Sequence, residues 1–198
     1  MLFIFIFIFL LQRRSYFINL IQTKFPDIKI IKPNVFEDQR GFFFESFNQN
    51  LFNKTLNKNI KFVQDNISYS KKNVLRGLHY QTEPFSQGKL VQVLEGDILD
   101  VVVDIRKSSP YFGEYLSIFL SSKNNYHLWI PPGFAHGFVV LSEFAKFFYK
   151  VTNYYSPSHE KVLKWDDADL GIDWVCKNPI LSSKDIINAH SFQELSLL

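Results

Sequence analysis

The chain has 198 residues, of which 46% are hydrophobic, and this length is enough for one domain with one sizeable core. Its formal net charge is only +3 and its basic residues form no long block, so the composition gives no sign of nucleic-acid binding. A single cysteine, Cys176, excludes an intrachain disulfide framework and favours a reducing compartment, hence a cytoplasmic protein. We interpret Cys176 as a small, partly buried side chain rather than a nucleophile.

The first residues form an unusual apolar run, residues 2–11, that is followed by Gln12, Arg13 and Arg14. The run is shorter than the roughly 20 residues that a membrane-spanning helix needs. It also lacks the basic start and the small-residue cleavage site of a signal peptide. We therefore interpret residues 1–15 as an apolar extension, with a misplaced translation start as the favoured origin, and residues 16–198 as one domain. A membrane-associated role for the run is the less favoured alternative.

Short apolar segments separated by turn signals then follow one another along the chain. Their composition and alternation predict strands, with a short helix at residues 47–59 and another near 184–189. The Glu95-Gly96 pair predicts a hairpin, and Pro131-Pro132-Gly133 a sharp break. The strands are expected at residues 25–31, 41–47, 62–68, 74–81, 89–94, 97–106, 115–121, 126–130, 137–141 and 144–153. This regular series indicates an all-β fold, a jelly-roll β-barrel of the cupin type with a few short helices.

Three polar side chains fall on apolar faces of these strands, because alternate residues of a strand share a face. Lys89 shares its face with Val91 and Val93, while Tyr149 lies on the apolar side of residues 144–151. His79 lies among apolar neighbours in residues 74–81. A buried polar group is costly without a partner or a function. On the pattern alone, a core tyrosine, a core histidine and a lysine at a barrel rim remain open alternatives.

The expected strand at residues 97–106 alternates differently. Leu99, Val101 and Val103 share one face, and Asp100 and Asp104 the other, with Arg106 beyond them. We interpret this as a core strand whose second face is solvated or ion-paired, and give the acidic residues structural roles. A metal site is not predicted, because Gln81 stands where a metal-binding cupin has its second histidine, and His127 and His136 flank the Pro-Pro-Gly turn too far apart to replace it.

A histidine, a lysine and a tyrosine without a metal or cofactor are suited to removing a proton beside a carbonyl group. Histidine is the base that titrates near neutral pH. A lysine can stabilise the enolate oxygen, and a tyrosine on the opposite side can return a proton and invert the carbon. Nucleophile, phosphate-loop and dinucleotide motifs are missing from the sequence.

The chain resembles the dTDP-4-dehydrorhamnose 3,5-epimerase family, cupin-type enzymes of dTDP-L-rhamnose biosynthesis for cell-surface polysaccharides. The resemblance runs from about residue 25 to residue 185. The motifs that carry it are EDQRGFFFESF (37–47), FVQDNISYS (62–70), NVLRGLHYQ (73–81), GKLVQV (88–93), DVVVDIRKSSPYFGEY (100–115), LWIPPGFAHGFVVLS (128–142), FYKVTNYYSPSHE (148–160) and SSKD (182–185).

The resemblance implies catalytic roles for four residues. His79 in RGLH corresponds to the proton-abstracting base, and Asp185 in SSKD to the carboxylate that orients it. Lys89 in GKLV corresponds to the lysine near the keto oxygen, and Tyr149 in FYK to the general acid of the opposite face. The residues that correspond to substrate-binding positions are Arg40, Glu45, Gln64, Asn66, Arg76, His136, Glu160 and Lys184, and Phe43, Tyr154 and Tyr155 are candidates for stacking on the base or lining the pocket.

By this resemblance, the substrate is dTDP-4-dehydro-6-deoxy-D-glucose, which is inverted at C3 and C5 to give dTDP-4-dehydro-L-rhamnose. Neither cofactor nor metal is implied, and the chain is expected to form a homodimer in which N-terminal strands, here near residues 17–31, complete the partner's sheet. A related epimerase that inverts C3 or C5 alone is the nearest alternative, and a cupin that only binds a nucleotide or sugar is the non-enzymatic one.

Overall fold

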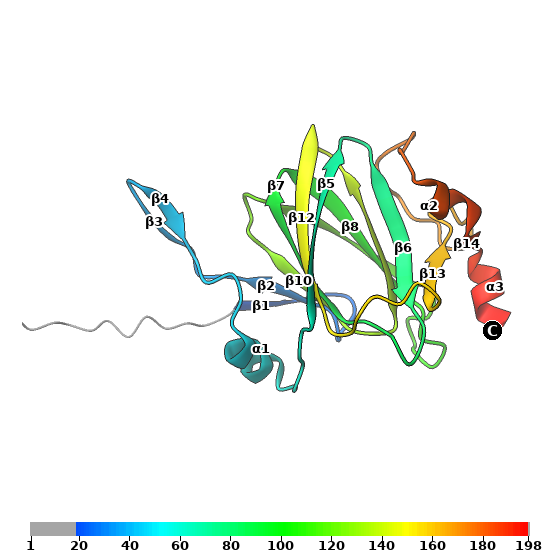
Figure 1. Ribbon diagram of the computed structural model, residues 1–198, viewed down its shortest axis with the longest axis horizontal. Coiled ribbons are helices and arrows are strands. Elements are labelled where there is room, and N and C mark those ends of the chain that lie inside the picture. The colour runs from blue at the N-terminus through cyan, green and yellow to red at the C-terminus, as the bar shows by residue number, and fades with distance from the viewer. Residues whose placement is uncertain (1–18, 198) are drawn as a thin grey trace, which may run out of the picture.

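The computed structural model describes residues 19–197, so the expected apolar extension at residues 1–15 lies outside the described residues. Two six-stranded sheets face each other, and a small hairpin projects away from them (Figure 1). All strand neighbours are antiparallel except β13 and β14. This arrangement confirms the predicted all-β jelly roll. None of the helices in residues 19–197 is long and apolar enough to cross a membrane.

The first sheet has the strand order β1-β2-β10-β7-β12-β5. Its strands are β1 (Asn19–Gln22), β2 (Lys29–Lys32), β10 (His127–Ile130), β7 (Lys89–Glu95), β12 (Phe144–Val151) and β5 (Gln64–Lys71). The second sheet has the order β14-β13-β6-β11-β8-β9. Its strands are β14 (Ala189–His190), β13 (Glu160–Leu163), β6 (Leu75–Gln81), β11 (Phe134–Val140), β8 (Asp97–Asp104) and β9 (Tyr115–Ser121).

The remaining elements are one hairpin and three short helices. The hairpin joins β3 (Phe36–Asp38) to β4 (Gly41–Phe43), and the helices are α1 (Gln49–Leu56), α2 (Ser183–Ile187) and α3 (Phe192–Leu197). Helix α1 confirms the helix expected at residues 47–59: Asn48 caps its start by accepting from the backbone of Leu51, and Asn57 ends it in the left-handed conformation.

The main core lies between the two sheets. Val91 and Val93 of β7 and Phe147 of β12 meet Ile98 and Val102 of β8 there. Lys89 and Tyr149 belong to the same inward faces, as their spacing from these residues predicts. Lys89 and Tyr149, which the alternation of the sequence predicted to lie on apolar faces, therefore point into the interior of the barrel.

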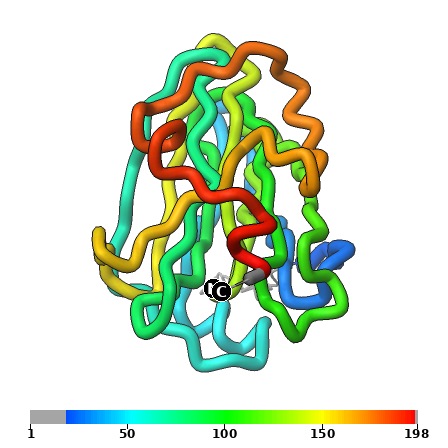
Figure 2. The backbone as a smooth tube through the Cα atoms, turned by 90° about the vertical axis from the view of Figure 1, so that its right-hand side faces the viewer, coloured from blue at the N-terminus to red at the C-terminus, as the bar shows by residue number. Residues whose placement is uncertain are grey.

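A second core lies on the outer face of the second sheet, where the C-terminal segment covers the sheet (Figure 2). Leu163, Leu170 and Trp174 of that segment pack against Val101 and Val103 of β8. Both faces of β8 are consequently buried, and Asp100 and Asp104 are fully shielded from solvent. Of the two alternatives for this face, solvated or ion-paired, the structure supports the second: Asp104 forms an ion pair with Arg106, and Asp100 is paired with His136.

Two other local expectations need correction. Glu95-Gly96 does not close a hairpin, because β7 and β8 belong to different sheets and the turn carries the chain from one sheet to the other. Residues 25–31 form a strand only from Lys29, since Pro26 has no N–H group for a sheet and Phe25 and Ile28 instead close a turn with both side chains in the core.

A close approach of β6 and β11 sets the register of the site. His79 lies directly opposite His136, and the register shifts before Arg76 meets Phe138. Gly77, at φ +121°, lies in this irregular stretch; a Cβ there would be 2.5 Å from the Cα of Gly137. Only glycine fits both the backbone angle and the space.

Gly77→Ala is expected to destabilise the fold by roughly 3 kcal/mol or more, since strain and a backbone clash act together. Gly171→Ala is the matched control: its φ is also positive, at +55°, but the nearest atom to its Cβ is 3.9 Å away. That control should lose only about 1 to 2 kcal/mol. Urea unfolding of both variants measures the difference, and equal losses would contradict the role of the close approach.

Candidate active site

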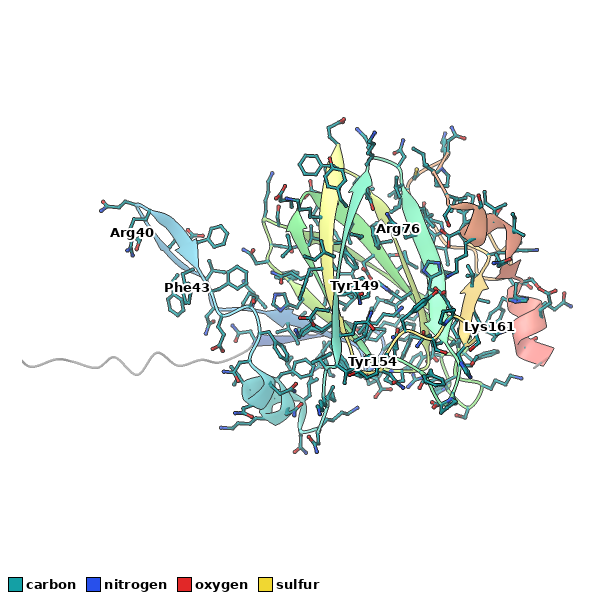
Figure 3. All side chains as sticks on the ribbon, in the orientation of Figure 1. Arg40, Phe43, Arg76, Tyr149, Tyr154 and Lys161 are labelled. Atoms are coloured by element: carbon teal, nitrogen blue, oxygen red, sulfur yellow. The ribbon has the colours of Figure 1, made fainter. Side chains whose placement is uncertain are left out.

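A cavity of about 270 Å³ opens between the two sheets. Its walls come from β6, β7, β11, β12 and β13, so it is the interior of the barrel rather than a surface groove. The predicted catalytic and binding residues that line it are Arg76, His79, Lys89, His136, Tyr149 and Glu160, and Gln81 and Tyr155 line it as well. Figure 3 shows Arg76 and Tyr149 inside the body of the barrel.

His79 is held by a carboxylate from the far end of the chain. Its Nε2 lies 2.5 Å from Oδ1 of Asp185 on α2, and the Asp185 side chain is only 3% exposed. The other oxygen, Oδ2, accepts a hydrogen bond of 2.8 Å from the Ser182 hydroxyl, and Ser182 also caps α2. Burial opposes ionisation of Asp185 and is the largest single influence, but the interactions with His79 and Ser182 together outweigh it and lower the pKa of that carboxyl. An ionised Asp185 that accepts from Nε2–H leaves Nδ1 of His79 as the basic nitrogen.

Lys89 directs its ammonium group into the cavity beside His79. Nζ donates a hydrogen bond of 3.2 Å to the backbone oxygen of His79. Burial lowers the pKa of Lys89 to about 8, against the opposing attraction of Asp100 and Glu160. The lysine therefore lies inside the barrel and does not extend to its rim. At neutral pH it is mostly protonated.

Tyr149 stands on the opposite wall, since β12 belongs to the first sheet and β6 to the second. Burial raises the pKa of its phenol, with Arg76 opposing and Glu160 and Tyr155 adding to the shift. The hydroxyl consequently keeps its proton at neutral pH. A proton acceptor on one wall and a proton donor on the other can act on the two faces of a molecule held between them.

His136 lies next to His79 in the second sheet and is buried. Both oxygens of Asp100 accept from its Nε2, at 3.0 and 2.9 Å. Burial lowers the pKa of His136, against the attraction of Asp100, so the ring is neutral at pH 7. Sequence reasoning missed Asp100. The signal was present, because Asp100 shares its strand face with the apolar Ile98 and Val102.

Glu160 borders the cavity as part of a surface cluster. It accepts hydrogen bonds from Lys184 and, at 2.6 Å, from the hydroxyl of Tyr155. Burial opposes ionisation of Glu160 and is the largest single influence, but the interactions with Lys184, Tyr155 and His79 together outweigh it and lower its pKa. Lys184 and Asp185 are neighbours on α2, so this helix contributes both to the rim and, through Asp185, to the interior.

The remaining polar positions lie on β6 of the second sheet and on β5 of the first sheet. Arg76 donates from Nε to the hydroxyl of Ser70 at 2.9 Å, which leaves the terminal nitrogens of its guanidinium group available for anions. Gln64 and Asn66 of β5 are hydrogen-bonded to each other at 2.9 Å, and Asn66 pairs with Tyr149 in the sheet. Arg76 lines the cavity, whereas Gln64 and Asn66 lie outside its lining, on the strand that pairs with the strand of Tyr149.

Two of the predicted binding residues that do not line the cavity, Arg40 and Glu45, belong to the segment of the projecting hairpin and the residues just after it. Arg40 is at the tip of the β3–β4 hairpin, with 84% of its side chain exposed and bound only to Asp38 (Figure 3). Glu45 lines a separate apolar cavity of about 40 Å³ near α1, together with His127. The fold thus separates the hairpin positions from the other members of the predicted site.

No group of three or more histidine, cysteine, aspartate or glutamate side chains within residues 19–197 is arranged to hold a metal ion. His79 and His136, the histidines nearest the cavity, each use Nε2 on a separate carboxylate. Gln81 uses its amide to hold the backbone of Phe85, Tyr154 and Ser156, and so orders the loop at the cavity mouth.

Comparison with known proteins gives consistent results. The sequence model of the family described as dTDP-4-dehydrorhamnose 3,5-epimerase matches residues 22–194. The dTDP-4-dehydrorhamnose 3,5-epimerase of Shigella flexneri is 54% identical over 168 residues, which cover 85% of this chain and 93% of that protein.

Solved structures agree with this match. The dTDP-6-deoxy-D-glucose-3,5-epimerase of Legionella pneumophila, in complex with dTDP-4-keto-L-rhamnose, has a TM-score of 0.86 at 46% identity, covering 90% of this chain and 97% of that chain. A 3'-monoepimerase from Streptomyces bikiniensis, in complex with dTDP-quinovose, has a TM-score of 0.83 at 30% identity, covering 89% and 91%. The same architecture therefore occurs in enzymes that differ in the number of carbons they invert.

Asp185→Asn should lower the stability of the folded chain by about 1 to 3 kcal/mol at pH 7, because a hydrogen bond to a charged acceptor is lost. The pKa of Asp185 is lower in the folded than in the unfolded chain, so its stabilisation is present above the unfolded pKa, about 3.9, and is lost as pH falls through the folded pKa. Urea unfolding at pH 7, 5 and 3.5 should show the gap between wild type and variant shrinking only at the acid end. Asp166→Asn, at an exposed site, serves as control; a gap independent of pH would contradict the assignment.

Proposed function

The chain belongs to the dTDP-4-dehydrorhamnose 3,5-epimerase family, and from this premise we propose that its barrel cavity inverts C3 and C5 of dTDP-4-dehydro-6-deoxy-D-glucose. The product is dTDP-4-dehydro-L-rhamnose, an intermediate of dTDP-L-rhamnose biosynthesis. The observation that carries the proposal is the placement of a carboxylate-held histidine and a protonated tyrosine on opposite walls of one cavity.

Proton removal falls to His79. The C4 ketone of the substrate acidifies the protons on both neighbouring carbons, C3 and C5. Asp185 holds the Nε2–H of His79, so the free Nδ1 is the atom that takes the proton. One base can serve both carbons if the sugar turns in the cavity between the two steps.

Lys89 stabilises the enolate. When the proton leaves C3 or C5, negative charge develops on the C4 oxygen, and an ammonium group near that oxygen lowers the barrier. The charge is already in place before the reaction, since Lys89 is mostly protonated at neutral pH. Enolisation moves only protons, so the reaction as proposed requires no redox cofactor.

Tyr149 completes the inversion. Its phenol gives a proton to the carbon from the wall opposite His79, and the carbon therefore takes the other configuration. After one inversion His79 holds an extra proton and Tyr149 lacks one, and exchange with water restores both. This sequence predicts that solvent hydrogen enters each inverted carbon.

The nucleotide part of the substrate needs cationic and polar partners. Arg76 offers a guanidinium fork toward the diphosphate. We assign further contacts to the polar residues around the cavity mouth, which are Gln64, Asn66, His136, Glu160 and Lys184. Tyr154 and Tyr155 are both exposed at that mouth and available for stacking on the base.

Arg40 and Glu45 lead us to propose a homodimer. Both match binding positions of the family, yet neither reaches the cavity of its own chain. A hairpin that projects from the barrel can instead reach the cavity of a second copy (Figure 1). The exposed rings of Phe42 and Phe43 on the same hairpin support this, because burial against a partner would remove them from water. We place the enzyme in the cytoplasm, in keeping with its single free cysteine.

The alternative is inversion at one carbon only. The similarity to a 3'-monoepimerase supports this alternative, because that enzyme and the present chain share the same fold. A cupin that only binds the sugar nucleotide is less well supported, because that function needs neither the His79–Asp185 pair nor the buried Lys89.

His79→Ala should lower the rate by about 10²- to 10⁴-fold, the usual contribution of a general base. The measurement is an NMR time course in D2O with purified dTDP-4-dehydro-6-deoxy-D-glucose. The wild type is expected to incorporate deuterium with inversion at both C3 and C5, and the variant at neither. Inversion at a single carbon would support the monofunctional alternative, and absence of exchange in the wild type would refute the proposed substrate.

Mixing two inactive variants tests the shared site. Arg40→Ala homodimers should bind substrate weakly, and His79→Ala homodimers should not catalyse. A heterodimer of the two contains one intact site if Arg40 serves its partner. After equal amounts are unfolded and refolded together, about half of the dimers are heterodimers by random pairing, and about a quarter of wild-type activity should return. No recovery in a preparation shown to contain heterodimers would contradict a shared site.

A further inference from the structure

Asp100 is a buried carboxyl group to which the proposed reaction assigns no role. It belongs to β8, and its side chain is completely shielded from solvent between the two sheets. It lies beneath the cavity lining, next to His136 of β11. An isolated carboxylate in such a place is strongly unfavourable, so its partners determine what it does.

The first partner is the ring of His136. Both carboxylate oxygens accept from Nε2, at 3.0 and 2.9 Å. The proton of the neutral ring is therefore on Nε2, and Nδ1 is left as a hydrogen-bond acceptor. His136 lies directly opposite His79 in the β11–β6 ladder. By holding the ring of His136, Asp100 therefore also fixes the side chain next to the base, His79.

The second partner is the charge of Lys89. In its ionised form Asp100 is not balanced by a neutral His136 and needs a cation nearby. Burial raises the pKa of Asp100, and His136 and then Lys89 oppose this shift. The attraction is mutual, because Asp100 is the first of the two groups that favour the charged form of Lys89.

The other groups around Lys89 do not replace Asp100. From β6 it meets the backbone oxygen of His79, and the same strand carries Arg76, whose charge has the wrong sign to stabilise it. Tyr149 on β12 holds its proton. Glu160 on β13 does favour a charged lysine, but it already receives hydrogen bonds from Lys184 and Tyr155. Asp185 on α2 is engaged by His79.

We propose that Asp100 is a positioning residue of the epimerase, the buried counter-ion that holds Lys89 as an ammonium group and the acceptor that fixes the ring of His136. The proposal rests on the proposed function only for its catalytic consequence, since Lys89 must carry a positive charge to stabilise the enolate. The arrangement itself, a carboxylate under the cavity with a histidine and a lysine above it, is independent of the substrate.

Asp100→Asn is the central test, because asparagine keeps the shape and one acceptor oxygen but removes the charge. Lys89 loses its counter-ion in this variant, so its ammonium group becomes easier to deprotonate. The alkaline limb of the kcat profile should move to lower pH by about one unit or more, the usual effect of a neighbouring opposite charge. KM should change by less than about threefold if substrate contacts are kept.

A direct titration of Lys89 separates this inference from the proposed function. In protein labelled with ¹³C at lysine Cε, the Lys89 signal is identified by its loss in Lys89→Met. Its titration should move to lower pH in Asp100→Asn, by the same amount as the alkaline limb. The titration needs no substrate, so it tests the counter-ion role even if the wild type proves inactive on dTDP-4-dehydro-6-deoxy-D-glucose.

Asp104→Asn is the matched control, since Asp104 is also fully buried on β8 but is bound to Arg106 and Ser109. It should lose stability without shifting either pH profile. Asp100→Leu, which removes the acceptor as well, should in addition release the proton of His136 to either ring nitrogen, visible in the ¹⁵N shifts of the ring. A Lys89 titration in Asp100→Asn that matches the wild type, with loss of thermal stability alone, would overturn the proposal.

Discussion

Ionisable side chains enclosed between two apolar sheets are the constraint on which the site depends. In this buried interior a charged group is stable only with a hydrogen-bonding or charged partner. His79 has Asp185, Lys89 has the backbone oxygen of His79, and His136 has Asp100. The same environment keeps the phenol of Tyr149 protonated. Proton acceptor, cation and proton donor are thus held in different states at one pH by burial and pairing together.

The C-terminal segment is as much a part of this arrangement as the barrel. It covers the outer face of the second sheet, which buries β8 on both sides (Figure 2). The same segment supplies Asp185 to His79 across a separation of 106 residues. The C-terminal segment therefore couples two features. It packs Leu163, Leu170 and Trp174 in the second core, and it orients the base through Asp185.

The hairpin β3–β4 has the opposite character. Its residues are exposed, and its two strands pair with each other in a separate two-stranded sheet. Arg40 and Glu45 belong to motifs that resemble the family's binding positions, but neither lines the barrel cavity of its own chain. Their position is what links substrate binding to assembly in the proposed dimer.

The sequence by itself determined the fold class and the inward direction of Lys89 and Tyr149, because alternation along a strand is a local property. It also predicted helix α1, whose caps are local as well. The resemblance assigned Asp185 to His79, a pairing for which the structure supplies the 2.5 Å contact. Only the tertiary structure decided that β7 and β8 separate into different sheets, that Asp100 lies beneath the cavity, and that Arg40 lies away from it. These features depend on which face another segment covers, and burial of that kind is a property of the assembled layers rather than of any stretch of sequence.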